Sequence, residues 1–205
     1  MKKLLAATLL ATPLLALAAP ANLLSNGSFD GDSVGADSWI TSMSPQGWST
    51  ASAGLELRNN VVGTAFDGNN FAELDTAGNS LISQTVGTVI GQWYTLSFEY
   101  SNRAGTDVST NGLAWSFGNV SGVAPTLAQN TSGDNQWNLF TTTFQATATQ
   151  TTLKLWATGT SDGLGSSLDA VSLTSVSAVP EPQSYAMLGA GLLVVAAMKR
   201  RRQPR

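Results

Sequence analysis

A two-residue alternation of apolar and polar side chains is the feature that most restricts how this chain can fold. In the stretch Trp93–Tyr100 every second residue is large and apolar. Successive side chains of a β-strand point to opposite faces, so the pattern predicts a strand with one buried face. The alternation recurs in three shorter stretches, 113–117, 153–155 and 171–173. No part of the 22–178 region shows a 3.6-residue period over ten residues, which argues against helices there.

Turn-forming residues separate these stretches. Asp67-Gly68-Asn69-Asn70, Asn111-Gly112 and Ser161-Asp162-Gly163 are rich in residues that accept the backbone conformations of tight turns. Further short strands are predicted at 22–29, 54–59, 71–74, 81–86 and 137–144. Eight or nine short strands at this spacing predict an all-β fold, a single β-sandwich over residues 22–178.

The charge of the 22–178 region differs from that of the whole chain. It holds three basic residues, Arg58, Arg103 and Lys154, against twelve acidic ones, a net charge of −9, whereas the complete chain carries −3. No basic face exists to neutralise phosphates, which excludes nucleic acid as a partner. An acidic domain would instead recruit divalent cations or simply stay soluble.

Cysteine and histidine are absent from the whole sequence. Disulfides therefore contribute nothing to stability. Cysteine nucleophiles, Ser-His-Asp triads, histidine-ligated zinc and histidine proton shuttles are all excluded.

The first 21 residues have the layout of a secretory signal peptide. Lys2 and Lys3 precede the largely apolar stretch 4–17, and small residues follow it. Cleavage is predicted between Ala18 and Ala21. Residues 1–21 are therefore interpreted as a targeting segment rather than as part of the fold.

The last 27 residues, 179–205, combine three features in a fixed order. Val179-Pro180-Glu181-Pro182 ends any preceding strand, because proline fixes φ and has no N–H to donate. The uncharged stretch 185–198 would form a helix of roughly 21 Å, against about 30 Å of hydrocarbon in a bilayer. The basic stretch 199–205 would stay on the cytoplasmic side of a membrane.

This order of proline-containing break, short apolar stretch and basic tail resembles the PEP-CTERM sorting signal. The resemblance implies a protein of a Gram-negative bacterium that is exported and held transiently in the inner membrane by residues 185–198. It also implies cleavage near Val179–Pro182 by an exosortase, a membrane transpeptidase-like enzyme, in bacteria that make extracellular polysaccharide. The product is then expected at the cell surface or in the extracellular matrix. An uncleaved single-span anchor is the alternative, and both interpretations place the 22–178 region outside the cytoplasm.

Three short segments carry a second similarity. They are Asn22–Asp30 followed by Gly47-Trp48, Phe71–Asp75 followed by Ile82-Ser83-Gln84, and Ser167–Leu173. The first resembles the start, and the third the last strand, of jelly-roll carbohydrate-binding modules of the galactose-binding-like type, and the second is similar to the middle of related secreted domains. The resemblance implies a jelly-roll sandwich whose first and last strands lie side by side.

In such jelly rolls a structural Ca²⁺ often ties the first and last strands together. The matching ligands here are Asp30 and Asp169, with backbone oxygens near Gly27 and with Glu73 or Asp75 assisting. Carboxylates are suitable, since Ca²⁺ takes six to eight oxygen ligands. Family members often have Glu where this chain has the shorter Asp30. The alternative is that Asp30 is a turn residue and Asp169 a solvated residue at a strand end.

Six tryptophans offer flat apolar faces of the kind on which sugar rings stack. Trp48 and Trp115 are predicted to belong to the core. Trp93 and Trp156 lie on outward strand phases, and Trp39 lies in a loop, so these three are the better candidates for stacking on a sugar ring. Arg103 could bind sugar hydroxyls. The ligand-binding candidates are Trp39, Trp93, Trp156 and Arg103. Arg58 and Asn102 could also bind hydroxyls, although arginines in an acidic domain are equally suited to ion pairs.

Catalysis by a glycosidase needs two carboxylates, one of them with a raised pKa. Glu73 and Asp75 share one face of a predicted strand, whereas Glu99 falls on an outward phase and is expected to be solvated. Without a catalytic motif, the chain is predicted not to be an enzyme. It is interpreted as an exported surface or matrix protein that binds or organises exopolysaccharide. A structural matrix protein without a specific ligand and a glycosidase are the alternatives.

Overall fold

The computed structural model describes residues 20–51, 53–176, 188–193, 195–196 and 199. The predicted signal peptide, apart from its last two residues, and the motif Val179–Pro182 lie outside the described residues. Helical structure in the C-terminal segment, at 188–193, 195–196 and 199, confirms the short hydrophobic helix. Among the described residues, no helix is long and apolar enough to cross a membrane.

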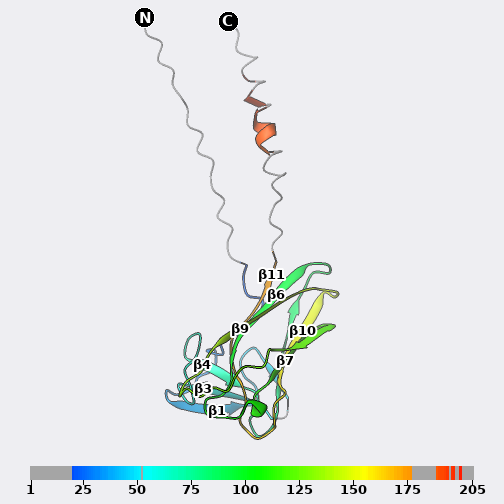
Figure 1. The fold of residues 1–205 in the computed structure, drawn as a ribbon. Coiled ribbons are helices and arrows are strands. Elements are labelled where there is room, and N and C mark those ends of the chain that lie inside the picture. The colour runs from blue at the N-terminus through cyan, green and yellow to red at the C-terminus, as the bar shows by residue number, and fades with distance from the viewer. Residues whose placement is uncertain (1–19, 52, 177–187, 194, 197–198, 200–205) are drawn as a thin grey trace, which may run out of the picture.

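Two antiparallel sheets packed face to face make up the domain (Figure 1). The six-stranded sheet contains, in spatial order, β1 (Ser38–Ser42), β3 (Leu55–Asn59), β4 (Asn70–Glu73), β11 (Ser167–Ser175), β6 (Trp93–Ser101) and β9 (Asn138–Gln145). The five-stranded sheet contains β2 (Ser49–Thr50), β5 (Leu81–Gly87), β10 (Gln150–Ala157), β7 (Leu113–Phe117) and β8 (Val120–Val123). Within residues 20–51 and 53–176, the only helix is a short 3-10 helix, Val108–Thr110. The predicted all-β jelly-roll sandwich is confirmed.

The hydrophobic core lies between the two sheets. The alternation in β6 places its apolar residues inward, where they meet the inward side chains of β7 and β10. Trp48 and Trp115 are buried, as the sequence predicts. Trp48 stacks on Phe29 with ring centroids 5.8 Å apart, so it closes one end of the core. Burial of these aliphatic and aromatic side chains is the main stabilising contribution to a fold without disulfides.

The predicted strand at 22–29 does not form. The segment turns repeatedly, and Asn26 and Phe29 have φ values of 52° and 61°, which no strand accommodates. It nevertheless lies beside β11, since Leu23 N donates to Leu173 O at 2.8 Å. The first and last parts of the domain are therefore adjacent, although only β11 is a strand. Three short strands, β1, β2 and β8, were not predicted.

Two loops, 60–69 and 130–137, cover part of the outer face of the six-stranded sheet and bind each other. Thr64 N donates to Asp134 Oδ1 at 2.6 Å, and Trp137 Nε1 donates to Thr64 O at 3.1 Å. Polar side chains on the outward phases of β4, β6 and β11 are buried as a result. Glu99 is among these residues, and burial raises its pKa. Its outward phase is as predicted, but the expectation that it is solvated is wrong, because the periodicity of a strand does not reveal a covering loop.

Candidate functional site

A hollow of about 450 Å³, the Trp39 pocket, lies on the outer face of the six-stranded sheet at β1 and β3. Trp39 and Arg58 are direct register partners on these two strands, so both side chains face the same side. Trp39 is 52% exposed and therefore presents its ring to solvent. It lies in a strand rather than in the predicted loop. The side chains that shape the pocket are Trp39, Thr41, Glu56, Arg58, Val62 and Arg103.

Two arginines and two glutamates form an ion-pair cluster at this pocket. Arg58 Nη2 lies 2.5 Å from Glu56 Oε1 and 3.1 Å from Glu73 Oε2. Arg103 Nη1 donates to both carboxylate oxygens of Glu73, at 3.0 and 2.9 Å. A fourth contact to the Glu73 carboxylate comes from Gly165 N, which donates to Oε1 at 2.7 Å. The cluster holds two of the three basic residues of the 22–178 region and is neutral when all four groups are ionised.

Burial dominates the electrostatics of this cluster. It raises the pKa of Glu73 to about 7, even though Arg58 and Arg103 act in the opposite direction. Burial also lowers the pKa of Arg58, against the attraction of Glu73 and Glu56. Arg58 Nε is buried and has no hydrogen-bond partner among the described residues. Such a donor is costly to leave unpaired, so an oxygen acceptor at this place would be stabilising.

A second hollow, the Trp156 groove, lies on the outer face of the five-stranded sheet and measures about 500 Å³. Lys154 and Trp156 alternate with the core leucines of β10, which directs both outward, and Ser116 of β7 lies opposite Lys154. Lys154 makes no ion pair with the described residues. Ser80 Oγ, in the groove wall, is buried without a hydrogen-bond partner in the described part of the chain.

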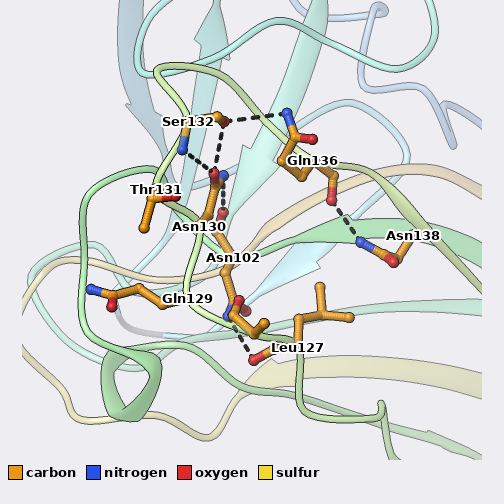
Figure 2. Close-up of a pocket in the computed structure, with 9 residues that line it drawn as sticks. Asn102, Leu127, Gln129, Asn130, Thr131, Ser132, Gln136 and Asn138 are labelled. Atoms are coloured by element: carbon orange, nitrogen blue, oxygen red, sulfur yellow. Dashed lines mark hydrogen bonds between the residues drawn. The ribbon is translucent and has the colours of Figure 1, made fainter.

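A third hollow, of about 340 Å³, is lined mainly by amide and hydroxyl side chains (Figure 2). Asn102 Nδ2 donates to the backbone oxygens of residues 127 and 128, at 3.2 and 3.0 Å. Asn130 Nδ2 donates to the backbone oxygens of Asn102 and Asp134, each at 2.9 Å. These amides therefore hold the segment 127–136 against the end of β6. We assign no ligand to this hollow, since its buried amides are engaged with the backbone.

The structure brings together only some of the predicted ligand-binding residues. Trp39 and Arg103 share one pocket, and Trp156 lies on the opposite sheet. Trp93 is 49% exposed, as its outward phase predicts, but it lies at the far end of the domain, beside Val176. The three tryptophans therefore do not form a single platform.

Two of the predicted metal ligands converge on one loop. Asp30 Oδ1 accepts hydrogen bonds from the backbone N–H groups of residues 69–70, at 2.8 and 3.0 Å. Asp169 Oδ2 accepts from those of residues 66–67, at 2.8 and 3.0 Å. Burial raises the pKa of Asp169 to about 7 in spite of these hydrogen bonds. Both carboxylates thus accept hydrogen bonds from the same loop.

The other two predicted metal ligands have different partners. Glu73 contacts the arginines described above, and Asp75 Oδ2 accepts hydrogen bonds from Asp162 N and Gly163 N at 3.0 and 3.1 Å. Asp75 Oδ1 is buried without a hydrogen-bond partner among the described residues. In the described ranges, no three His, Cys, Asp or Glu side chains are grouped as a metal site would require.

Sequence reasoning did not identify Glu56 as an ion-pair partner, and it left Arg58 open between binding hydroxyls and forming ion pairs, of which the structure shows the ion pairs. A signal for both was present, because Glu56 and Arg58 alternate with Leu55 and Leu57 in β3 and must share the outer face. No sequence signal marks Ser80, whose unpartnered hydroxyl depends on how the neighbouring strands pack.

Comparison with known proteins finds similarity for the domain among solved structures and for the sorting segment among family models. The "Family 16 Carbohydrate Binding Module-2" gives a TM-score of 0.52 at 13% identity, over 75% of this chain and 99% of that one. The arabinose-bound MgGH51 α-L-arabinofuranosidase gives 0.50 at 12% identity, over 76% of this chain and 26% of that enzyme. The CBM22-1 xylan-binding domain of Paenibacillus barcinonensis Xyn10C gives 0.46 at 16% identity, over 80% of this chain and 100% of that one. No curated protein sequence matches the chain.

A family model described as the PEP-CTERM protein-sorting motif matches residues 178–202. The match covers the predicted break, the apolar stretch and most of the basic end. Residues 178–202 therefore carry the PEP-CTERM sorting motif, which indicates an exported protein sorted to the cell envelope or surface, and the preceding domain has the fold of carbohydrate-binding modules.

Proposed function

We propose that the 22–178 domain is a non-catalytic module that binds polysaccharide in the Trp39 pocket. The observation that carries the proposal is the exposed ring of Trp39 in a pocket that Arg103, Arg58 and Glu56 also line. A sugar offers both an apolar ring face for the indole and hydroxyl groups for the charged side chains of the pocket. Arg103 and Glu56 add further groups that can bind hydroxyls at the pocket wall.

The fold and the sorting motif support this proposal. The family 16 module with the same fold is a carbohydrate-binding module by name. Export to the envelope or surface would bring the domain to extracellular polysaccharide, and processing by an exosortase would follow from the motif. We therefore extend the proposal to the binding or organisation of exopolysaccharide at the cell surface or in the matrix of a Gram-negative bacterium.

The carboxylates beside the pocket favour binding over hydrolysis. Glu56 and Glu73 are register partners on β3 and β4 and both contact Arg58, so they form a close pair. Glu73 is only 1% exposed, and both of its oxygens are engaged by Arg103. A general acid must reach the glycosidic oxygen of its substrate, which this carboxyl group cannot do.

The proposal is tested by isothermal titration of the full chain with xylan, galactan and their oligosaccharides. We expect Trp39→Ala to weaken binding about fivefold, because ring stacking contributes on the order of 1 kcal/mol. Trp93→Ala is the matched control, since it removes an equally exposed tryptophan at the other end of the domain. Equal affinity of Trp39→Ala and the parent chain would contradict the proposal.

The Trp156 groove is the second candidate for the same activity. The observation in its favour is that, within the described part of the chain, Ser80 Oγ has no hydrogen-bond partner and Lys154 makes no ion pair. Loss of binding in Trp156→Ala, with Trp39→Ala unchanged, would move the site to the five-stranded sheet. Absence of saturable binding to any glycan would instead favour a structural matrix protein without a specific ligand.

We also propose that Ca²⁺ is held at the loop 66–70 by Asp30 and Asp169. Support comes from the convergence of these two carboxylates on one loop, although they are 139 positions apart in the chain. Oxygens of the loop backbone would have to complete the ligand set, because Ca²⁺ takes six to eight ligands. The ion would join the beginning of the domain to its last strand.

A further inference from the structure

One end of the sandwich carries no charged side chain; we call it the uncharged end. It is formed by the turns 87–92, 118–119 and 146–149 and by the segments 20–25 and 172–176. Backbone hydrogen bonds join these parts, from Gly91 N to Ala146 O and from Val176 N to Trp93 O, both at 2.8 Å. Figure 1 shows the ends of β6 and β11 here, where the chain leaves the domain. All fifteen charged residues of the 22–178 region lie in other segments.

Large apolar side chains stand exposed on the uncharged end: Leu23, Val89, Ile90, Trp93 and Val176. Val89 and Ile90, at the tip of the β5–β6 turn, are 66% and 63% exposed. Leu23, Val89 and Val176 line one hollow of about 520 Å³. Apolar side chains gathered in this way mark an interaction surface rather than the scattered exposure of an ordinary surface.

The position of this end in the chain identifies what it meets. Val176 is nine residues before Tyr185, where the apolar stretch 185–198 begins. Nine residues span at most about 32 Å when fully extended. A chain held in a bilayer by 185–198 therefore keeps the uncharged end within that distance of the membrane.

We infer that the uncharged end lies against the lipid bilayer while residues 185–198 are held in it, with Ile90 and Trp93 at the boundary between headgroups and acyl chains. The inference rests on the sorting of the chain by its tail that we propose above. Tryptophan is enriched at this depth of the membrane, and exposed aliphatic side chains gain from burial there.

The charge distribution determines the kind of contact. Without basic residues at this end, the contact is hydrophobic, so uncharged phosphatidylcholine suffices and salt does not weaken it. The net charge of −9 on the rest of the domain opposes other orientations near an anionic leaflet. The contact with the bilayer also gives a role to Trp93, which lies away from the Trp39 pocket and the Trp156 groove.

The test uses the chain without its signal peptide, residues 22–205, in phosphatidylcholine vesicles, with Ile90→Cys carrying an environment-sensitive NBD label. The sequence contains no cysteine, so the label is unique. Val123→Cys is the matched control, because Val123 is 65% exposed at the end of β8 away from the turn 118–119. We expect a blue shift of emission and quenching by doxyl-labelled lipid at position 90, unchanged in high salt, and neither effect at position 123.

Each other outcome overturns the inference in a distinguishable way. Flotation with the vesicles but no change at position 90 overturns the docking of the uncharged end alone. Failure to float with the vesicles overturns membrane holding by the tail, and the docking with it. Polysaccharide binding is measured separately by titration and is unaffected by either result.

Discussion

At the scale of single residues, Glu73 is the centre of the candidate site. It holds Arg58 and Arg103 in place, and these are two of only three basic residues in a domain of net charge −9. Breaking a buried ion pair by removing one partner is strongly destabilising, because the other charge stays buried. Glu73 therefore positions the arginines that border the Trp39 pocket, rather than contacting a ligand itself.

The titration of Glu73 predicts a specific dependence of stability on pH. Its pKa in the folded state, about 7, lies above the ordinary value of 4.5, so the folded state binds the proton more tightly than the unfolded state. This contribution to the free energy of unfolding is fully present below about pH 4.5 and is lost as the pH rises through about 7. Between pH 5 and 8, the free energy of unfolding measured in urea should fall by up to about 3 kcal/mol more for the parent chain than for Glu73→Gln.

Comparison with Glu73→Gln isolates this residue, because both chains retain Asp169, whose raised pKa adds a loss of the same sign. Parallel stability curves for the two chains would show that Glu73 is ionised throughout this range and would contradict the prediction.

At the scale of elements, the sequence predicts strands best where one face is buried and the other is polar. β6 follows this rule over nine residues and was predicted almost completely. The exposed edge strands β1 and β8 have no buried face of their own, so their residues do not alternate in a recognisable way. The prediction of a strand at 22–29 was wrong for another reason. The apolar residues of this segment pack into the core from a turning backbone, with positive φ at Asn26 and Phe29.

The loop 66–70 is the element on which the calcium proposal can be decided. A cation that binds only the folded state stabilises it, so EDTA should lower the melting temperature of the full chain by several degrees. Asp30→Asn should abolish that response, since Asp30 is exposed and its replacement leaves the core intact. An unchanged melting curve, with no calcium by elemental analysis, would leave both carboxylates as acceptors for the loop N–H groups only.

The candidate site shows the same division between what a pattern reveals and what packing decides. Outward phases were predicted correctly for Trp93 and Trp156, because strand periodicity fixes the face of a side chain. Which outward residues meet depends on strand order, and β1 and β3 become neighbours only through pairing that the sequence does not display. Trp39 lies in β1 and Arg103 follows β6, and they meet in one pocket only because of the strand order of the sheet. Their proximity therefore could not be predicted from the sequence.

At the scale of the whole molecule, attachment and recognition are separated. The Trp39 pocket and the Trp156 groove both lie near the turn 76–80, at the opposite end of the strands from Val176. A domain whose uncharged end rests on the membrane would present both hollows outward. Neither hollow would then be covered by the surface that holds the protein.

Processing of the tail gives a prediction at this scale. If residues 179–205 act as a transient sorting signal, the mature surface protein should end near Pro182, and mass spectrometry of its C-terminal peptide measures this directly. Recovery of surface protein that still ends at Arg205 would favour the uncleaved anchor instead.

The course of β11 has a mechanical consequence. The strand begins at Ser167, opposite Glu73 of the candidate site, and ends at Ser175, next to the tail, and it is paired with β6 over most of its length. Tension between a polymer bound at one end and an attachment at the other would run parallel to this strand. Its hydrogen bonds to β6 would then be loaded in shear, all at once, rather than peeled apart one by one. Loaded in this way, a small domain without covalent cross-links would resist being pulled open by the flow of water past a cell.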